Sequence, residues 1–468
     1  MKHTLAGLII AVCLVAFATS CKKNSFITSP DAQLTVSADT LKFDTVFTSL
    51  GSVTRSFKII NDNHQKLLLS KIKLMGGNIS SYKINVNGHA ASEVNNLEIE
   101  ANDSIYVFVS VTINPNLSNL PFIISDSILI SYNGNNRFVQ LQAYGQNANF
   151  LRNKVITGNV TWVNNLPYVI LGSIRIDTSA SLTIQPGCRI YSHADAPFIV
   201  DGTLLVNGTK PDSVVFTGDR LDVDYKDLPA SWPGIYFRGS SKNSVLKYAI
   251  IKNAYQAVVA EKASSNAPVS KLILHQCIID NAYDAGLLCV NTSMQADNSL
   301  ITNCGSNIVL SYGGEYNLTH CTVAGFSTIY INHRNPVLQV NNAALQGGTI
   351  VSANLNAVFR NCIFWGEAGI INDEVTVNKQ GTTPFSVLFD HCLYRAVTDP
   401  LNVTLAMCIK NQYPSFDSID AYKKIFDFHI TKNAGAPGIN QGNIITQNSR
   451  DLDNKLRTGI PDMGCYEK

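Results

Sequence analysis

The sequence predicts an all-β protein in which a β-sandwich is followed by a long solenoid of stacked β-coils. Three observations predict this fold class. Val, Ile, Leu, Asn, Ser and Thr dominate the 468 residues, as is typical of strands and turns. Short runs that alternate between apolar and polar residues fill the first third of the chain. The rest carries a motif that recurs every 17 to 30 residues.

Composition and charge exclude several classes of protein. Hydrophobic residues make up 45% of the chain, so we do not expect it to be disordered. Lys and Arg together number 36 and Asp and Glu 34, which gives a formal net charge of +2. Because this balance offers little attraction for a phosphate backbone, we expect no nucleic-acid partner.

The first residues have the pattern of an export signal. Lys2 is followed by an apolar stretch, Leu5 to Phe17, which is too short to span a membrane. Ala18-Thr-Ser-Cys21 then resembles the bacterial lipobox, where the chain is cut before the cysteine and the thiol is acylated. The resemblance implies a signal peptide over residues 1–20, lipidation of Cys21 and a polar tether over residues 21–31. A plain secretory signal with an incidental cysteine is the alternative.

These features predict a lipid-anchored protein of the cell envelope. Several acyl chains on Cys21 would hold it stably at a membrane without spanning it. The residue after Cys21 is not Asp, so the resemblance favours the outer membrane over the inner one. The leaflet stays open.

The cysteines do not suggest a disulfide framework. Of the eleven, Cys13 leaves with the signal and Cys21 carries the lipid, so nine remain. An odd number spread over a long chain does not favour a disulfide scaffold, and without a Cys-x-x-Cys pair we expect no zinc site. We expect most of the nine to be small core residues.

Residues 32–147 form the predicted sandwich. Seven to nine short alternating runs are separated by polar turns such as Asn87-Gly and Asn133-Gly. This region resembles the immunoglobulin-like modules of exported proteins in architecture, although it lacks their Cys…Trp…Cys pattern. It is either a binding module or a spacer, and we favour the spacer.

Residues 155–468 carry the repeat, in which an apolar strand is followed by Asn or His and then by Ala or Cys. The Asn or His stands at Asn253, Asn281, Asn303, His320, Asn342, Asn361 and His391. A period near twenty residues built from short strands predicts stacked coils that share one core. Asn suits a sharp turn because it tolerates the left-handed backbone region. We therefore expect these seven residues to form one ladder of turns.

Motifs at both ends of the repeat add to this interpretation. Leu182-Thr-Ile-Gln-Pro-Gly and Ile199-Val-Asp-Gly-Thr stand near its start, and Pro461-Asp-Met-Gly-Cys-Tyr-Glu closes the chain. The region resembles the right-handed parallel β-helix of the pectate-lyase-like superfamily, with a C-terminal cap. That fold hosts lyases, hydrolases, esterases, epimerases and proteins without catalytic activity, so it does not define the activity.

In enzymes of this superfamily, the strand after such a turn usually belongs to the sheet that carries the active site. Alternation predicts that one set of residues on these strands points inward, namely Val258, Leu287, Ile308, Ile329, Ile350 and Ile370. The outward rows then contain two acidic residues, Glu261 and Asp373. Five coils would hold them about 24 Å apart, too far for a glycosidase pair.

The catalytic sequence motifs of the superfamily are also missing. Arg334-Asn-Pro-Val-Leu-Gln339 begins like the Arg-x-Pro-x-x-Arg of pectate lyases but lacks the second Arg. A lyase needs a base and a cation near the sugar, and His333 with Arg334 is the best local pair. The alternative is a polar loop at the rim of the coils.

Two further features lie near the predicted coils. Asp219, Asp222, Asp224 and Asp227 share one loop and would supply oxygen ligands for Ca²⁺, but the spacing of a calcium loop is absent. We therefore expect no cofactor, with Ca²⁺ as the alternative. Tyr236, Trp365 and Tyr394 are either sugar-stacking platforms or core residues, and we favour the core.

The sequence leaves open whether the chain is an enzyme. We favour an envelope lipoprotein whose β-helix contacts a polysaccharide or envelope glycan without catalysis. A polysaccharide lyase is the first alternative, and a structural or adhesive envelope protein is the second.

Overall fold

The computed structural model describes residues 25–47, 54–113, 122–223, 225–262, 270–367, 369–430, 432, 435–446 and 448–468. The chain divides into two compact units, residues 1–148 and 149–468. Each unit has its own hydrophobic core. Within the described residues, no helix has both the length and the apolar character needed to cross a membrane.

The first unit is a sandwich of two five-stranded sheets. One sheet has the order β1 (Leu34–Val36), β3 (Arg55–Asn61), β8 (Ser104–Val111), β5 (Tyr82–Val86) and β6 (His89–Ala90). The other has the order β2 (Thr40–Phe47), β10 (Asn135–Gln146), β9 (Phe122–Tyr132), β4 (Leu67–Leu74) and β7 (Glu93–Ile99), and a short 3₁₀ turn spans Gly77–Ile79.

Alternation along each strand builds the core of the sandwich. In β8, Ile105, Val107 and Val109 are buried, and the residues between them face outward. Asn133 and Gly134 both have positive φ at the hairpin between β9 and β10, as a tight primed turn requires. The predicted sandwich is confirmed.

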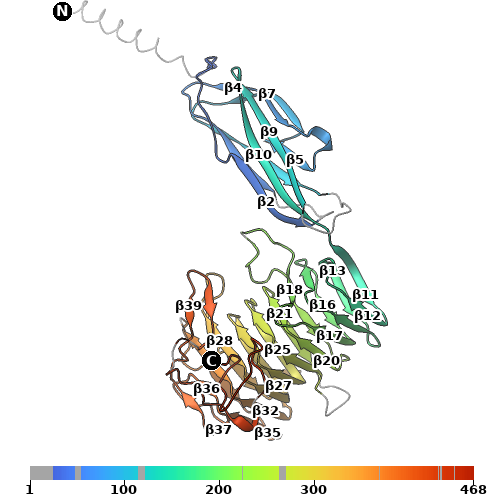
Figure 1. The fold of residues 1–468 in the computed structure, drawn as a ribbon, viewed down its shortest axis with the longest axis vertical. Helices are drawn as coiled ribbons and strands as arrows, with labels where there is room; N and C mark the ends of the chain where they lie inside the picture. The colour runs from blue at the N-terminus through green and yellow to red at the C-terminus, as the bar shows by residue number, and fades with distance from the viewer. Residues whose placement is uncertain are drawn as a thin grey trace, which may run out of the picture. The chain divides into compact units, whose positions relative to one another are not determined.

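The second unit is a parallel β-helix, formed by one continuous set of 26 strands. Most strands pair in parallel with the strand one coil further along the chain, so the coils stack, as Figure 1 shows. The pairings define three long sheets. We call these sheets the first, second and third stacks. The predicted fold class, an immunoglobulin-like sandwich followed by a parallel β-helix, is confirmed.

The strands of the three stacks have the following bounds. The first stack contains β16 (Phe198–Val200), β19 (Ile235–Phe237), β22 (Gln256–Glu261), the first half of β25 (Ala285–Asp297) and of β27 (Ser306–Thr319), β29 (Leu338–Asn341) and β34 (Val375–Asn378). The second contains β12 (Asn159–Trp162), β14 (Ser181–Ile184), β17 (Thr203–Asn207), β20 (Ser244–Lys247), β23 (Leu272–His275), the second half of β25 and of β27, β32 (Leu355–Arg360), β35 (Phe385–Asp390) and β37 (Thr404–Ala406). The third contains β15 (Arg189–Ser192), β18 (Val214–Gly218), β21 (Ala249–Lys252), β24 (Ile278–Asp280), β26 (Leu300–Thr302), β28 (Thr322–Phe326), β33 (Ile363–Glu367), β36 (Leu393–Tyr394) and β38 (Ile409–Lys410). β11 (Asn149–Ile156) and β13 (Tyr168–Ile176) open the helix.

The inward row of the first stack matches the expectation only in its first three coils. Val258, Leu287 and Ile308 pair in register and are fully buried. The next members of the row are Leu338 and Val375. The other expected members are exposed, namely Ile329 (56%), Ile350 (60%) and Ile370 (82%).

Insertions explain this difference. The coil between His320 and Asn361 is 41 residues long, about twice the expected period. It contains a loop over residues 327–337, in which Ile329 lies, and an antiparallel hairpin of β30 (Ala343–Gln346) and β31 (Thr349–Ser352). The segments around Ile329 and Ile350 have strand-like sequences but lie outside the coil.

The turn residues form two columns where the sequence predicted one. Asn253, Asn281 and Asn303 follow aligned strands of the third stack and have φ between 53° and 62°. The other column follows the second stack and has positive φ at Tyr248, Gln276, Asn298, His320, Asn361, His391 and Met407. Side chains bond along both columns, from Asn281 Nδ2 to Asn253 Oδ1 (2.9 Å) and between Asn361 Nδ2 and His320 Nε2 (2.9 Å).

Asn342 belongs to neither column. It follows β29 of the first stack, is fully buried, and its amide nitrogen bonds to Gln380 O (2.9 Å) and Thr383 Oγ1 (3.1 Å). It therefore fixes the base of the inserted hairpin.

The second column is followed by small residues that point into the tube, among them Cys277, Cys321, Cys362 and Cys392. All nine described cysteines are free thiols, and eight of them are buried.

The C-terminal segment lies along the side of the β-helix. It contains the hairpin of β39 (Ser418–Asp420) and β40 (Ile425–Asp427) and a 3₁₀ turn, Ile444–Thr446. Phe416, Phe428 and Met463 form a second apolar cluster with outer residues of the third stack, such as Leu300 and Ile363. The segment therefore covers the outer face of the third stack from β24 onward.

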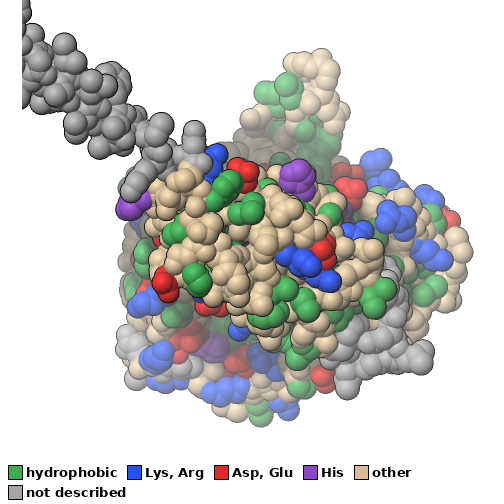
Figure 2. All heavy atoms as spheres, turned by 90° about the horizontal axis from the view of Figure 1, so that it is seen from above, with side chains coloured by type: hydrophobic (Ala, Val, Ile, Leu, Met, Phe, Trp, Pro, Cys, Tyr) green, Lys and Arg blue, Asp and Glu red, His purple; other side chains and the backbone are tan. Residues whose placement is uncertain are grey.

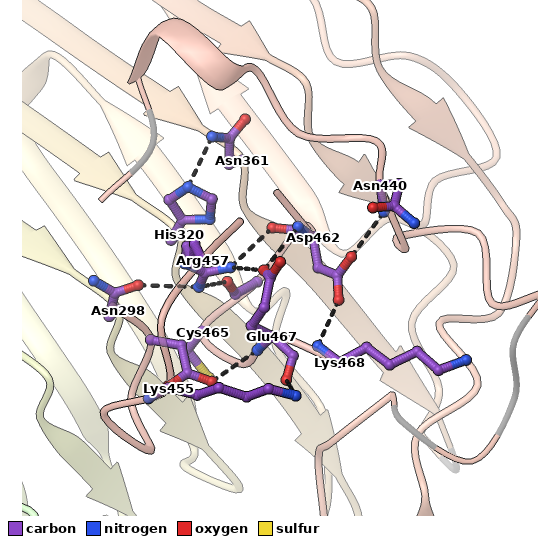
Figure 3. Close-up of polar contacts among 12 residues, drawn as sticks. Asn298, His320, Asn361, Asn440, Lys455, Arg457, Asp462, Cys465, Glu467 and Lys468 are labelled. Carbon is purple, nitrogen blue, oxygen red and sulfur yellow. Dashed lines mark hydrogen bonds and ion pairs between the residues drawn. The ribbon is translucent and has the colours of Figure 1, made fainter. Parts of the chain in front are cut away.

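A buried ion pair fastens this segment to the second turn column (Figure 3). The side chain of Arg457 is completely buried and pairs with Glu467 at 2.7 Å. Its Nη2 also donates to Asn298 Oδ1 at 3.0 Å and to Gly464 O at 2.9 Å. The guanidinium group thus joins residues 159 positions apart in the sequence.

Candidate functional site

The outer face of the first stack is the best candidate for a binding surface. One outward row runs through Ile199, Tyr236, Val259, Leu288 and Val309 in successive coils. Val259 is 5% exposed, whereas the other four are only partly buried. In the third stack, the equivalent row is buried against the C-terminal segment in its later coils, at Leu300, Ile363 and Leu393. The first stack thus presents a continuous apolar stripe along the axis of the helix, which we call the apolar stripe.

A shallow pocket lies at the N-terminal end of the apolar stripe. It measures about 260 Å³ and is lined by Ile199, Tyr236 and Val259, with Arg238 and Glu261 at its edge. The hydroxyl of Tyr236 donates to Pro233 O at 3.0 Å, which fixes the ring in the row. Burial raises the pKa of Tyr236 above its ordinary value, so this phenol stays neutral at physiological pH.

Two exposed tyrosines form one rim of this surface. Tyr255 and Tyr283 are 45% and 55% exposed. Their rings stack with centroids 5.9 Å apart and planes 24° apart. Each follows an Asn of the first turn column by two residues, so the coil repeat stacks them. Stacked, exposed aromatic rings in register with the coils provide flat apolar platforms beside the apolar stripe.

The other rim is charged and rigid. Arg238 pairs with Asp201 through its Nε at 2.7 Å, and this hydrogen bond lowers the pKa of the Asp201 carboxyl. Buried Lys271 donates to the carbonyl oxygens of Arg238 and Gly239, both at 3.1 Å, and to that of Glu261. Burial lowers the pKa of Lys271 to about 8. The ammonium group thus fixes the chain where β19 and β22 end.

Tyr255 and Tyr283 were not among the residues that the sequence singled out. A signal was present, because Asn253-Ala-Tyr255 and Asn281-Ala-Tyr283 repeat in consecutive coils. Of the three aromatic residues that the sequence singled out, Tyr236 lies partly exposed on this face, although the core was favoured for all three. Trp365 and Tyr394 are 4% and 2% exposed and belong to the apolar clusters of the helix.

The structure separates His333 from Arg334. His333 is 3% exposed, and its Nε2 lies 2.9 and 3.0 Å from the carboxylate oxygens of Glu374, whose side chain is completely buried. Arg334 is exposed. Gly366 makes room for the pair, because a Cβ there would lie 2.4 Å from His333 Nε2. In this arrangement His333 fastens the 327–337 loop to the helix.

The two predicted acidic residues do not share a row. Glu261 lies in the outward row, paired with Val290 and then with Ser311 in the next coils. Asp373 precedes β34 and accepts hydrogen bonds from the backbone of Val397 (2.6 Å) and Thr398 (3.2 Å). The prediction that placed Asp373 in the outward row is wrong, because the inserted segments shift the register.

The aspartates of the 218–233 loop have separate partners. Asp219 bonds to His193 Nδ1 at 2.7 Å, Asp222 pairs with Arg220 at 2.9 Å, and Asp227 lies 3.7 Å from Lys424 Nζ. Asp224 lies outside the described residues, as does Cys21. Among the described residues, no group of three or more metal-ligating side chains comes together.

Charges of both signs are mixed on the face that Figure 2 shows. In the view of Figure 2, Lys and Arg side chains are interspersed with Asp and Glu. This matches the formal net charge of +2.

No protein-family model matches the sequence, and neither does any curated protein sequence. Three solved structures are similar to the chain over about a quarter of its length. A protein of unknown function from Porphyromonas gingivalis W83 is 12% identical over 27% of this chain and 50% of that one, with a TM-score of 0.19. A family 123 glycoside hydrolase from Clostridium perfringens is also 12% identical, over 28% of this chain and 30% of that one (TM-score 0.19). A PapD-like domain of human CEP192 is 10% identical over 26% of this chain and 89% of its own length, with a TM-score of 0.17.

Proposed function

We propose that the chain is an exported lipoprotein of the cell envelope, similar to the pectate-lyase-like superfamily, whose β-helix binds polysaccharide without catalysis. Lipidation at Cys21 would hold it at the outer membrane. The polysaccharide would lie along the outer face of the first stack, parallel to the axis of the helix.

The apolar stripe with its stacked tyrosine rim is the observation that carries this proposal. Sugar rings have apolar faces that pack on aromatic rings, and Tyr236, Tyr255 and Tyr283 offer such rings along one direction. The outward row then continues as Gln339 and Thr376, whose amide and hydroxyl groups are suited to hydrogen-bond with sugar hydroxyls. Successive coils repeat about every 4.8 Å, so the contacts suit a ligand that is itself a repeating chain.

The alternatives have less support from the described residues. A lyase that uses His333 and Arg334 needs both groups at the sugar, whereas His333 is buried against Glu374. A purely structural or adhesive role does not require exposed stacked rings beside an open stripe.

The test measures binding of the full-length protein to neutral and acidic polysaccharides by affinity gel electrophoresis and on a glycan array. We expect Tyr255→Ala and Tyr283→Ala each to weaken retention about tenfold, the loss of about 1.4 kcal/mol of stacking. The control is Tyr422→Ala, because Tyr422 is 89% exposed and lies in the C-terminal segment.

Equal retention of wild-type protein, Tyr255→Ala and Tyr283→Ala would refute the proposal, as would the absence of binding to every polysaccharide. Ultraviolet absorbance of unsaturated uronides, lost in Arg334→Ala, would instead establish the lyase. Co-purification with envelope proteins in the absence of glycan binding would establish the structural role.

A further inference from the structure

A second pocket shares no lining residue with the pocket of the apolar stripe, and it lies between the first turn column and a wall formed by the 327–337 loop and the β39–β40 hairpin. It measures about 190 Å³. Lys252, Asp280 and Asn303 line one side of it, and Ile329, Tyr330 and Phe426 line the other. The first side belongs to the coils, and the second comes from the 327–337 loop and from β40.

The first turn column ends in this pocket with an unsatisfied amide. Asn281 donates to Asn253 of the preceding coil, but the residue that follows Asn303 in the column is Gly325, which has no side chain. Asn303 Oδ1 is therefore buried without a hydrogen-bond partner in the structure. The whole residue is only 3% exposed. A buried acceptor of this kind is destabilising unless a donor reaches it.

Two charged groups beside Asn303 have unused hydrogen-bonding capacity. Asp280 accepts from Thr302 Oγ1 (3.0 Å) and Asn303 Nδ2 (3.4 Å), both through Oδ1, and a carboxylate has about four acceptor sites. Burial raises the pKa of the Asp280 carboxyl. Lys252 pairs in register with Asp280, and its ammonium group acts on the Asp280 carboxyl through the electrostatic field without forming a close ion pair in the described part of the chain.

The far wall completes the site. Lys424 Nζ donates to the hydroxyl of Tyr330 at 3.0 Å and lies 3.7 Å from Asp227 Oδ2, so this cation is already compensated. Phe426 and Ile329 add an apolar surface opposite the polar groups. The pocket thus combines two acceptors, one available cationic donor and an apolar wall, with no excess of charge.

We propose that this pocket binds one neutral sugar unit through two adjacent hydroxyl groups. One hydroxyl would donate to Asn303 Oδ1 and the other to the Asp280 carboxylate. The ammonium group of Lys252 would donate to the oxygen atoms of these two hydroxyl groups. The apolar face of the ring would lie on Phe426 and Ile329. The pocket would therefore hold a single sugar, separately from a polysaccharide on the apolar stripe, and it does not depend on that proposed function.

The experiment titrates the full-length protein with glucose, galactose, mannose and N-acetylglucosamine, observed by saturation-transfer NMR and calorimetry, with glucuronate as the acidic comparison. We expect at least one neutral sugar to bind. Lys252→Met and Asn303→Gly should each weaken that binding tenfold or more; glycine tolerates the positive φ of 53° at position 303. Lys247→Met, an exposed lysine of the same coil on another face, should bind as wild type does.

The outcomes separate this proposal from the first one. Sugar binding that survives Lys252→Met and Asn303→Gly but is lost in Tyr255→Ala would place the sugar on the apolar stripe and overturn the pocket. Binding of glucuronate alone would overturn the neutral class of ligand. No binding of any of the five sugars by a protein that still binds polysaccharide would also overturn it. Circular dichroism of each variant shows whether the fold is retained.

Discussion

At the scale of the residue, asparagine has two roles in the turns of the β-helix. Its backbone adopts positive φ at low cost, and its amide bonds to the turn of a neighbouring coil or to a covering segment. Asn361 shows both roles, with φ of 53°, a bond to His320 and a bond from the backbone NH of Asn443 to its Oδ1 at 2.7 Å. The same residue therefore links the second column to the C-terminal segment.

Substitution of Asn361 should separate the two roles. We expect Asn361→Ala to lower the free energy of unfolding by about 3 kcal/mol, because it adds left-handed strain to the loss of hydrogen bonds. Asn361→Gly loses only the hydrogen bonds, so it should cost about 1–2 kcal/mol less than alanine. Urea denaturation followed by circular dichroism measures both values. Equal destabilisation by alanine and glycine would contradict the role of the backbone.

At the scale of the element, the C-terminal segment depends on a histidine that bridges two carboxylates. His429 lies 2.5 Å from Asp427 and 2.8 Å from Asp453, and Asp453 also pairs with Lys210 of the coils. The hydrogen bond to Asp453 is the largest influence that raises the pKa of His429. The same bond is the main reason that the pKa of Asp453 falls to about 2.

These shifts predict how docking of the segment depends on pH. His429 has a raised pKa in the folded state, so its contribution is complete below its unfolded pKa near 6.5 and is lost as the pH rises through the folded pKa. Asp453 has a lowered pKa, so its contribution is present above about 3.9 and is lost as the pH falls toward 2. We expect hydrogen exchange of residues 448–468 to be slowest between these limits, after correction for the intrinsic exchange rate.

His429→Gln should remove the upper limit of this window, because glutamine does not titrate. The amides of β20 and β23 serve as the internal reference. If exchange of the segment rises in parallel with that of the reference strands in both proteins, the histidine does not control docking.

At the scale of the whole molecule, the stability of the chain comes from two separate hydrophobic cores. The sandwich buries its own apolar residues, and the β-helix forms one continuous cluster from Ile156 to Ala396. In a solenoid each coil contacts mainly its neighbours, so the stability of the helix is close to a sum over coils. A unit with its own core is in principle able to fold alone.

We therefore expect calorimetry of the full-length protein to show two transitions. Residues 149–468 expressed alone should unfold within a few degrees of one of them, and a fragment ending at residue 148 should account for the other. A single transition that shifts in both fragments would show that the units stabilise one another. The same fragments also show which unit retains polysaccharide binding.

Much of the fold could be predicted from local pattern. Alternation predicted the sandwich strands, and the recurring Asn or His before a small residue predicted stacked coils. The prediction of a single ladder failed because each coil has two turns with similar residues. Asn303 and Asn361 both precede a cysteine, yet they belong to different columns. The candidate site was less predictable. Tyr236 was named from the sequence, whereas Tyr255 and Tyr283 become a platform only when successive coils stack.

The sequence by itself determined the strand period, the position of most turns and the burial of the cysteines, because these follow from neighbours within one coil. Only the tertiary structure decided which strand-like segments join the coils and which leave them as the 327–337 loop and the β30–β31 hairpin. It also decided which face is covered by the C-terminal segment and which is left open. These outcomes depend on contacts between residues of different coils or segments, from His333 with Glu374, 41 positions apart, to Arg457 with Asn298, 159 positions apart. No local periodicity encodes such contacts.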